Sequence, residues 1–435
     1  MKFSDFDQKI IDENVDFTVK EITKICEEIG PRESGSKEAV AAEAELEKML
    51  RNFSSEVHYE GYKMAPKAFL HFTKSVSDVI IPSLAAATAL HYSGKGGKVF
   101  PDALVFGTTA AGLTITAEEF LFYKRFCDIL YKKTDGHTLV ATRKATEETK
   151  KRIVIVGHID SEYEWRHTYY GKGKGMGPIM GGTIVSAIAS CVMSALNLVG
   201  TAGKLSDKSF FKLVNKLSYP VYLFTIPNMI TLHSFINYNV ISPGANDNLT
   251  GTLAAFCALK MLDEAGIEFK HTDVVCCIND GEEAGLRGAK QYAEDHLHEF
   301  TEEGVETHIL AVDTLTDREY MNIYNRDLTG QVRHDPKWSQ FVMDSAHDAG
   351  ITDPKFANVY FGASDAAAFT QAGISATCLA AMDPGPADYY HNRKDKPDRL
   401  NPVAIRDGYK IILSTILNFA GDDDVVLSKK DKEDK

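Results

Sequence analysis

A strongly apolar run that ends in two adjacent carboxylates constrains this chain more than any other feature. The run Asp273-Val274-Val275-Cys276-Cys277 is typical of a buried strand, and it leads into Ile278-Asn279-Asp280-Gly281-Glu282-Glu283-Ala284-Gly285. Glu282 and Glu283 have no Lys or Arg immediately beside them, and like charges this close repel unless a positive group compensates. A pair of glutamates alone is most often a solvated loop, so its meaning depends on the rest of the chain.

Two further predicted strands also lead to a histidine or an acidic residue. The run Ile153-Val154-Ile155-Val156 has no polar residue, which is typical of a parallel strand covered on both faces, and it leads to His158. The run His308-Ile309-Leu310-Ala311-Val312 leads to Asp313. Helices are predicted near residues 251–265, 288–298, 338–349 and 402–419. This alternation predicts an α/β fold with a mixed, mostly parallel central sheet flanked by helices.

Composition excludes some classes of function. A length of 435 residues suits an α/β enzyme with insertions. The net charge of −13, without a basic block, argues against a nucleic-acid partner. Seven cysteines without a C-x-x-C pair favour a reducing compartment, and the first residues do not resemble a signal peptide. We therefore expect a cytoplasmic protein.

Acidic and histidine side chains gather where predicted strands end. His158, Glu282, Glu283 and Asp313 follow strands, Asp247 precedes a helix, and His391 lies in the loop after the strand at 376–380. Ligands bind outside the carboxyl ends of strands in open α/β sheets. Imidazole and carboxylate suit zinc-like cations, and a pair of such cations requires a bridging carboxylate. Each of these residues alone is more often structural than functional, but their common location indicates a metal site with one glutamate left as general base.

The motifs resemble those of the di-zinc aminopeptidases and glutamate carboxypeptidases of metallopeptidase family twenty-eight. Those proteins carry, in this order, the motifs that are here His158-Ile159-Asp160, Gly244-Ala245-Asn246-Asp247-Asn248, Glu282-Glu283-Ala284-Gly285, Asp313, Ser364-Asp365 and Tyr390-His391. The upstream segment Pro31-Arg32-Glu33-Ser34-Gly35-Ser36 is also similar. Each motif is weak alone, whereas six in order form a specific pattern.

The resemblance implies a role for each residue. One metal ion, most simply Zn²⁺, would be held by His158, Asp247 and Asp313. A second would be held by Asp247, Glu283 and His391, with Asp247 bridging. Further roles would fall to Glu282 as general base, Asp160 as partner of His158, and Tyr390 as donor to the tetrahedral intermediate. The substrate would be a peptide or an amino-acid amide.

Two insertions depart from the family pattern. Residues 1–67, 134–167 and 242–420 form the predicted catalytic domain, and residues 421–435 form a predicted disordered tail. The insertions, 68–133 and 168–241, contain apolar runs at 79–92, 104–116, 177–199 and 217–241, and an aromatic helix is expected at 120–131. They predict apolar helical hairpins that form a soluble cap, a homo-oligomer contact or a membrane subdomain. The lysines Lys204, Lys208, Lys212 and Lys216 oppose a membrane span by the positive-inside rule if the catalytic domain is cytoplasmic.

The sequence favours a metal-dependent aminopeptidase, and it leaves other functions open. A non-catalytic receptor on the same fold would have lost metal ligands, and none of the five is missing. A carboxypeptidase or amidohydrolase acting on acyl-amino acids or dipeptides remains an alternative. A serine hydrolase is disfavoured because Gly362-Ala363-Ser364-Asp365-Ala366 lacks the second glycine of that motif. His296 and His298, which flank a Leu on a polar helix, are expected at the surface.

Overall fold

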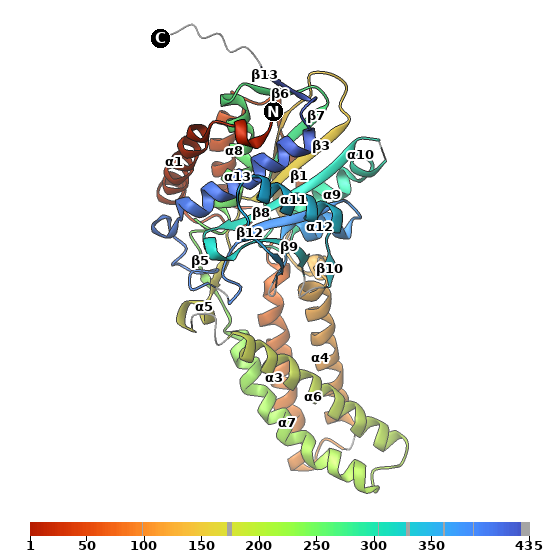
Figure 1. The fold of residues 1–435 in the computed structure, drawn as a ribbon. Coiled ribbons are helices and arrows are strands. Elements are labelled where there is room, and N and C mark those ends of the chain that lie inside the picture. Colours follow the sequence, from red (N-terminus) through yellow and green to blue (C-terminus); the bar gives the residue numbers. More distant parts are fainter. Residues whose placement is uncertain are drawn as a thin grey trace. The chain divides into compact units, whose positions relative to one another are not determined.

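The chain divides into two compact units. The computed structural model describes residues 1–97, 99–171, 176–302, 304–327, 331–359, 362–385 and 387–427. The sheet unit comprises Met1–Pro66, Lys133–Glu164 and Asn239–Lys435, and the helical unit comprises Lys67–Lys132 and Trp165–Tyr238. Figure 1 shows both, with strands confined almost entirely to the sheet unit.

A mixed sheet forms the centre of the sheet unit. In the described part of the chain its order is β1-β2-β7-β3-β8-β12-β9-β10, with β11 beside β9. The central strands β7, β3, β8 and β12 are mutually parallel, and antiparallel pairs flank them on both sides. The bounds are β1 Glu56–Met64, β2 Thr134–Arg143, β3 Lys151–His158, β7 Thr272–Asn279, β8 Glu306–Leu315, β9 Met321–Asp327, β10 Val332–Arg333, β11 Phe356–Asn358 and β12 Ala376–Ala381. This order confirms the predicted fold class.

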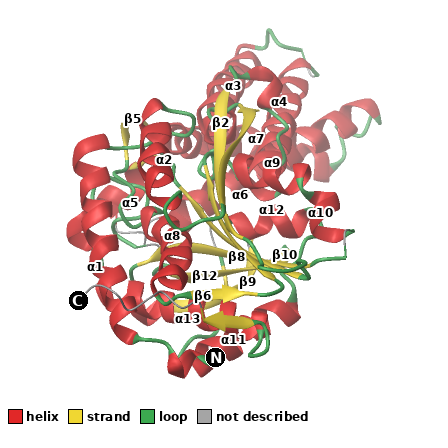
Figure 2. Ribbon diagram, turned by 90° about the horizontal axis from the view of Figure 1, so that it is seen from above, coloured by secondary structure: helices red, strands yellow, loops and turns green. Residues whose placement is uncertain are grey.

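Helices cover both faces of this sheet (Figure 2). One face carries α1 (Gln8–Lys24), α2 (Lys37–Leu50), α8 (Leu249–Glu264), α11 (Pro336–Asp348) and α13 (Pro402–Ala420). The other carries α9 (Arg287–Asp295), α10 (Leu297–Thr301) and α12 (Asp365–Gln371). Because β7 is buried over its whole length, its sequence is apolar rather than alternating.

A close contact between α8 and the sheet determines where the site lies. A Cβ atom at Gly157 in β3 would lie 2.6 Å from the backbone carbon of Gly251 in α8. A Cβ atom at Gly251 would in turn collide with the carbonyl oxygen of Val312 in β8. The start of α8 can therefore approach the ends of both strands only because both positions are glycine.

Two small sheets complete the unit. β13 (Val425–Leu427) pairs with β6 (Ile267–Phe269), and β4 (Tyr163–Trp165) pairs with β5 (Ile236–Ile241). The expectation of a disordered tail from residue 421 is thus wrong for 425–427. An apolar Val-Val-Leu segment follows Asp424, whose carboxylate accepts hydrogen bonds from His271 and Thr272 and fixes the segment beside β6. Residues 428–435 lie outside the described residues.

The helical unit consists mainly of two hairpins. α3 (Ala68–Ser93) packs on α4 (Phe100–Thr116), α6 (Met176–Ala202) packs on α7 (Ser209–His233), and α3 also packs on α7 and α4 on α6. The short α5 (Arg166–Gly171) precedes α6. Among the described residues, α6 is the one helix long and apolar enough to cross a membrane, and 28% of its apolar window is buried.

Two expectations for this region are wrong. Residues 120–131 do not form a helix. The π-helical turn Ala117–Leu121 ends the helical run, Tyr123 has a positive φ, and only the short turn Asp128–Leu130 follows. Residues 217–241 are not one apolar helix either, because α7 ends at His233 and the alternating Ile-Asn-Tyr-Asn-Val-Ile segment becomes β5.

His296 is also more than a surface residue. Its Nδ1 lies 2.7 Å from Glu299 and its Nε2 lies 2.9 Å from Glu60 on β1, so the imidazole joins α10 to the sheet. Burial lowers the pKa of His296, but the hydrogen bonds to Glu299 and Glu60 outweigh burial and raise this pKa to about 9. The second expected surface histidine, His298, is exposed.

His296→Gln should therefore lower stability in a pH-dependent way. The pKa of His296 is higher in the folded state than its value of about 6.5 in the unfolded state. Protonated His296 therefore stabilises the fold fully below about pH 6.5, and this stabilisation is lost as the pH rises through about 9. Urea unfolding should show the largest midpoint difference between wild type and variant at pH 6 and a much smaller one at pH 9.5. His298→Gln is the matched control and should change little. A difference that stays constant over this range would contradict a charged His296.

Candidate metal centre

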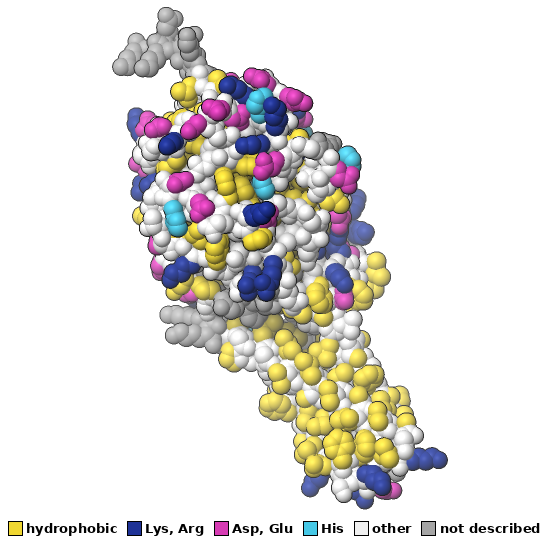
Figure 3. All heavy atoms as spheres, turned by 45° about the vertical axis from the view of Figure 1, so that its right-hand side comes forward, with side chains coloured by type: hydrophobic (Ala, Val, Ile, Leu, Met, Phe, Trp, Pro, Cys, Tyr) yellow, Lys and Arg dark blue, Asp and Glu magenta, His cyan; other side chains and the backbone are white. Residues whose placement is uncertain are grey.

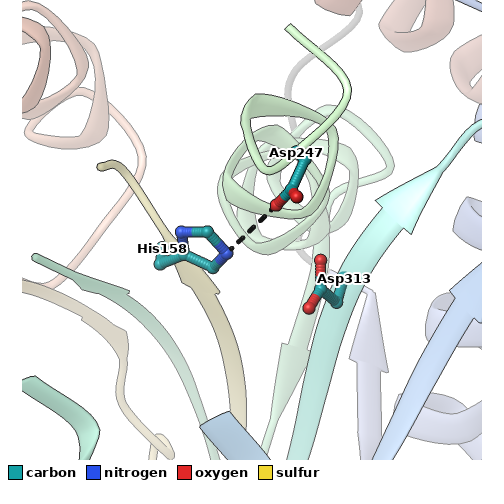
Figure 4. Close-up of side chains that lie close together, drawn as sticks. All are labelled: His158, Asp247 and Asp313. Carbon is teal, nitrogen blue, oxygen red and sulfur yellow. Dashed lines mark ion pairs between the residues drawn. The ribbon is translucent and has the colours of Figure 1, made fainter. Parts of the chain in front are cut away.

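The predicted site residues converge at the carboxyl edge of the central strands. His158 is the last residue of β3, Asp313 lies near the end of β8, and Asp247 immediately precedes the start of α8. Figure 4 shows these three side chains facing one another across a small space. Glu283 comes from the loop after β7 and His391 from the loop after β12. Parallel strands bring these distant segments together because their carboxyl ends share one edge.

Two groups of ligand atoms lie next to each other. Ligand atoms of His158, Asp247 and Asp313 are all within 4.8 Å of one another, and so are those of Glu162, Glu283 and His391. Asp247 connects the groups, since its Oδ1 is 3.6 Å from His158 Nε2 and its Oδ2 is 3.1 Å from His391 Nε2. Glu283 Oε2 is 3.4 Å from the same His391 nitrogen. The two oxygens of Asp247 thus face opposite groups.

Asp160 organises the segment that carries the two glutamates. This fully buried carboxylate accepts hydrogen bonds from the backbone N–H groups of Glu282 (3.2 Å) and Glu283 (3.1 Å) and from the Ser34 hydroxyl (2.6 Å). His158 Nδ1 is 3.2 Å from the Asp160 carbonyl oxygen and 3.5 Å from its carboxylate. The orientation of His158 is therefore set mainly by the backbone of Asp160, and the carboxylate holds the glutamate loop.

Glu282 lies beside the ligands without belonging to either group. Its Oε2 is 3.8 Å from His158 Nε2, so its carboxyl group lies beside the first group. Burial raises the pKa of Glu282 well above its usual range, and the charges of Asp365 and Asp313 add to this effect while His158 opposes it. A carboxyl group with a raised pKa beside a metal site is suited to accept and return a proton.

The donor set fits divalent cations. Each group combines one imidazole with two carboxylates, which is the ligand chemistry of zinc. Among the described residues, His158 Nε2 and Glu283 Oε1 are buried without a hydrogen-bond partner. Burial and the charge of Asp247 together raise the pKa of Asp313 to about 7. So many buried carboxyl groups repel one another, and positive charge between them relieves that repulsion.

Arg32 ties three loops of the site together. Its guanidinium is fully buried and donates to the carbonyl oxygens of Ile159 (2.7 Å), Pro243 (3.0 Å) and Gly244 (2.9 Å). These carbonyl groups lie in the segments that carry Asp160 and Asp247. The arginine of the upstream Pro-Arg-Glu-Ser motif thus has a structural role, because it holds these two segments together.

Sequence reasoning missed two buried acids. Glu162 belongs to the second ligand group although no role was expected for it. Asp395 accepts hydrogen bonds from the backbone N–H groups of Asn246 (2.8 Å) and Asp247 (3.0 Å) and holds the bridging loop. Its position four residues after His391, and that of Glu162 four residues after His158, were the available signals.

The remaining expected residues are nearby. The Tyr390 ring stacks on the His391 ring with centroids 3.8 Å apart. Ser364 donates to Asp327, and Asp365 accepts from Asn279 at the end of β7. His391 itself has a positive φ of 48°, an uncommon backbone conformation for a non-glycine residue that often marks a functional site.

Comparison with known proteins gives a family match and several similar folds. The model of Peptidase family M28 matches residues 229–416. No curated protein matches the chain. Similar solved structures include an aminopeptidase from Aneurinibacillus sp. strain AM-1, with 14% identity, a TM-score of 0.52 and coverage of 99% of this chain and 98% of that one. A zinc aminopeptidase from Bacillus subtilis has 12% identity, a TM-score of 0.53 and coverage of 92% and 94%.

A glutaminyl cyclase from Fimbriiglobus ruber is similar to the same degree, with 13% identity, a TM-score of 0.54 and coverage of 92% and 94%. At such low identities these structures establish the fold alone, and two activities occur among them. The resemblance expected from the motifs is confirmed: residues 229–416 match the model of Peptidase family M28, and the chain has a fold that zinc aminopeptidases and glutaminyl cyclases share.

Proposed function

We propose that the protein is a two-metal exopeptidase that removes the N-terminal residue from peptides or amino-acid amides. One observation carries this proposal. Asp247 presents one oxygen to His158 and the other to His391, and Glu282 lies beside His158 without joining either group. Such an arrangement suits two bridged ions with a separate base for a water molecule.

Each residue of the site has a separate role in the proposed hydrolysis. The chemistry that divalent ions supply in such a centre is polarisation of the scissile carbonyl and acidification of a water molecule. Glu282 accepts the proton of that water and passes it to the leaving amine. The Asp160 carboxylate accepts a hydrogen bond from the backbone N–H group of Glu282 and so keeps Glu282 in place. Tyr390, stacked on His391, donates to the tetrahedral intermediate.

The charge of the site favours a substrate with a free amino group. Glu162 adds a fourth carboxylate to the ligand groups, beyond Asp247, Asp313 and Glu283. Arg32 donates to backbone carbonyl groups, and Nε and Nη2 of Arg393 donate to the Glu164 carboxylate at 2.6 and 2.7 Å. A substrate carboxylate would meet this surplus of negative charge, whereas an amine would be attracted. This favours an aminopeptidase over a carboxypeptidase acting on acyl-amino acids.

Cyclisation of an N-terminal glutaminyl residue is the second candidate, since glutaminyl cyclases share the fold. In that reaction the substrate's own amine attacks its side-chain amide, so no water nucleophile is required. The set of five ligands with a bridging carboxylate, and a base beside it, suits water activation instead.

A substrate panel with Glu282→Gln tests the activity. Zinc-loaded wild type should hydrolyse aminoacyl amides and dipeptides, and should act on N-acetylated equivalents about 100-fold more slowly, because the amine is lost. Glu282→Gln should keep its metal and lose about 10²- to 10⁴-fold in kcat, as expected for a general base. Near-normal turnover in this variant would remove Glu282 from the mechanism. Ammonia release from glutaminyl peptides without hydrolysis would support the cyclase instead, and cleavage confined to N-acyl amino acids would support a carboxypeptidase.

Metal content tests the bridging role. Asp247→Ala should lose both ions because its carboxylate faces both groups, whereas His391→Ala should lose mainly one. Elemental analysis after dialysis against a weak chelator gives the metal per chain. Asp12→Ala, an exposed carboxylate on α1, is the control and should keep both. Two firmly bound ions in Asp247→Ala would exclude the bridge.

A further inference from the structure

Helix α6 of the helical unit has an inverted distribution of polarity. Apart from Met176 at its start, its buried positions are small or polar, whereas large aliphatic side chains face outward. The buried set includes Thr183, Ser186, Ser190, Ser194 and Asn197, and the exposed set is Ile184, Val185, Ile188, Val192 and Val199. A helix on the surface of a soluble domain shows the opposite arrangement.

The other long helices also expose large apolar side chains, although α3 and α7 bury apolar side chains as well. Exposed large apolar side chains are Val79 and Tyr92 on α3, Phe100 and Phe106 on α4, and Phe210, Leu213, Leu217, Leu223, Phe224 and Ile230 on α7. Figure 3 shows hydrophobic side chains over most of the visible surface of these helices. A soluble monomer rarely exposes an apolar surface of this extent. Because every helix of both hairpins contributes, a single protein partner would cover only part of it.

Polar groups inside the unit satisfy one another. The Asp102 carboxylate on α4 accepts hydrogen bonds from Asn197 on α6 (3.0 Å) and Tyr222 on α7 (2.9 Å). Ser190 and Thr225 join α6 to α7 at 2.8 Å. Polar residues between membrane helices behave in this way, since hydrocarbon offers no alternative partner. An acidic residue in a membrane helix likewise faces the interior of the bundle.

Lengths and charges fit a bilayer. α6 has 27 residues without a charge, about 40 Å at 1.5 Å per residue, and the hydrocarbon core is about 30 Å thick. α3 and α7 have 26 and 25 residues. The exposed lysines Lys204, Lys208, Lys212 and Lys216 gather around the turn between α6 and α7. Long lysine side chains at helix ends reach lipid phosphates while their stems remain in the apolar layer.

We propose that the helical unit is embedded in a lipid bilayer, with its apolar outer faces against acyl chains and Lys204 to Lys216 at the headgroups of one leaflet. This proposal does not depend on the proposed activity.

The flanking charges also suggest an orientation. Each hairpin leaves the sheet unit and returns to it, so both ends lie on the same side. Among the described residues, eight Lys and Arg residues flank the hairpins on that side: Lys63, Lys67, Lys74, Lys124, Arg125, Lys132, Lys133 and Arg166. Five described lysines lie at the turns: Lys95, Lys204, Lys208, Lys212 and Lys216. Lys204 to Lys216 taken alone oppose a cytoplasmic sheet unit, but the excess counted over both hairpins favours one by the positive-inside rule, and there the buried thiols Cys257, Cys276 and Cys378 remain reduced.

Flotation of cell membranes tests the embedding. The full chain should rise with lipid vesicles in a sucrose gradient and should stay with the membrane after washing at pH 11, and only detergent should release it. Recovery of the wild type in the high-speed supernatant without detergent, as a defined oligomer, would overturn the proposal in favour of a soluble cap or dimer. A pellet that does not float would indicate aggregation and would also overturn it.

A matched pair of double variants identifies the surface. Ile188→Lys with Val192→Lys puts two charges on the outward face of α6, at positions that are 46% and 49% exposed. This variant should lower the floating fraction severalfold. Val40→Lys with Val403→Lys, at positions of the sheet unit that are 40% and 51% exposed, should float like the wild type. Equal flotation of both variants would mean that another part of the chain binds the membrane and would contradict the proposal.

Discussion

Repulsion among buried carboxyl groups is the constraint on which the site depends. Asp247 and Asp313 lie close to His158, and Asp247 and Glu283 lie close to His391, at positions that are buried or half-buried. Burial disfavours their charged forms, and mutual repulsion adds to that cost. A bound divalent cation in each group would supply positive charge between these carboxylates and relieve their repulsion. On the proposed function, metal binding and the close approach of the carboxylates therefore depend on each other.

The rest of the sheet unit holds the ligands against that repulsion. Asp160 binds the backbone of the glutamate loop, Arg32 binds the carbonyl groups of two neighbouring loops, and Asp395 binds the backbone of the Asp247 loop. The glycine contact between β3 and α8 allows Asp247 to reach the space between His158 and Asp313. These interactions preorganise the ligands, so that little rearrangement is needed when metal or substrate binds.

The sequence predicted the parts whose signal is local. Buried parallel strands are apolar without alternation, and the residues that end them were identified from the printed order alone. Glu162 and Asp395 were missed because an isolated acid in a loop has no pattern until the fold brings it to a ligand. The expected helix at 120–131 is interrupted by the positive φ at Tyr123, and the tail at 425–427 is ordered because it pairs with the distant strand β6. Neither feature can be inferred from hydrophobic periodicity. In the helical unit, composition alone could not show which face of each apolar helix is inside, because that depends on the neighbouring helices.

Zinc-edge anomalous diffraction from crystals of the zinc-loaded protein would show directly whether Asp247 bridges two ions. We expect two anomalous peaks about 3.5–4 Å apart, one on each side of the Asp247 carboxylate, with His158 and Asp313 at one and Glu283 and His391 at the other. A single peak that leaves Glu283 and His391 without metal, or no peak between these side chains, would contradict this bridging role.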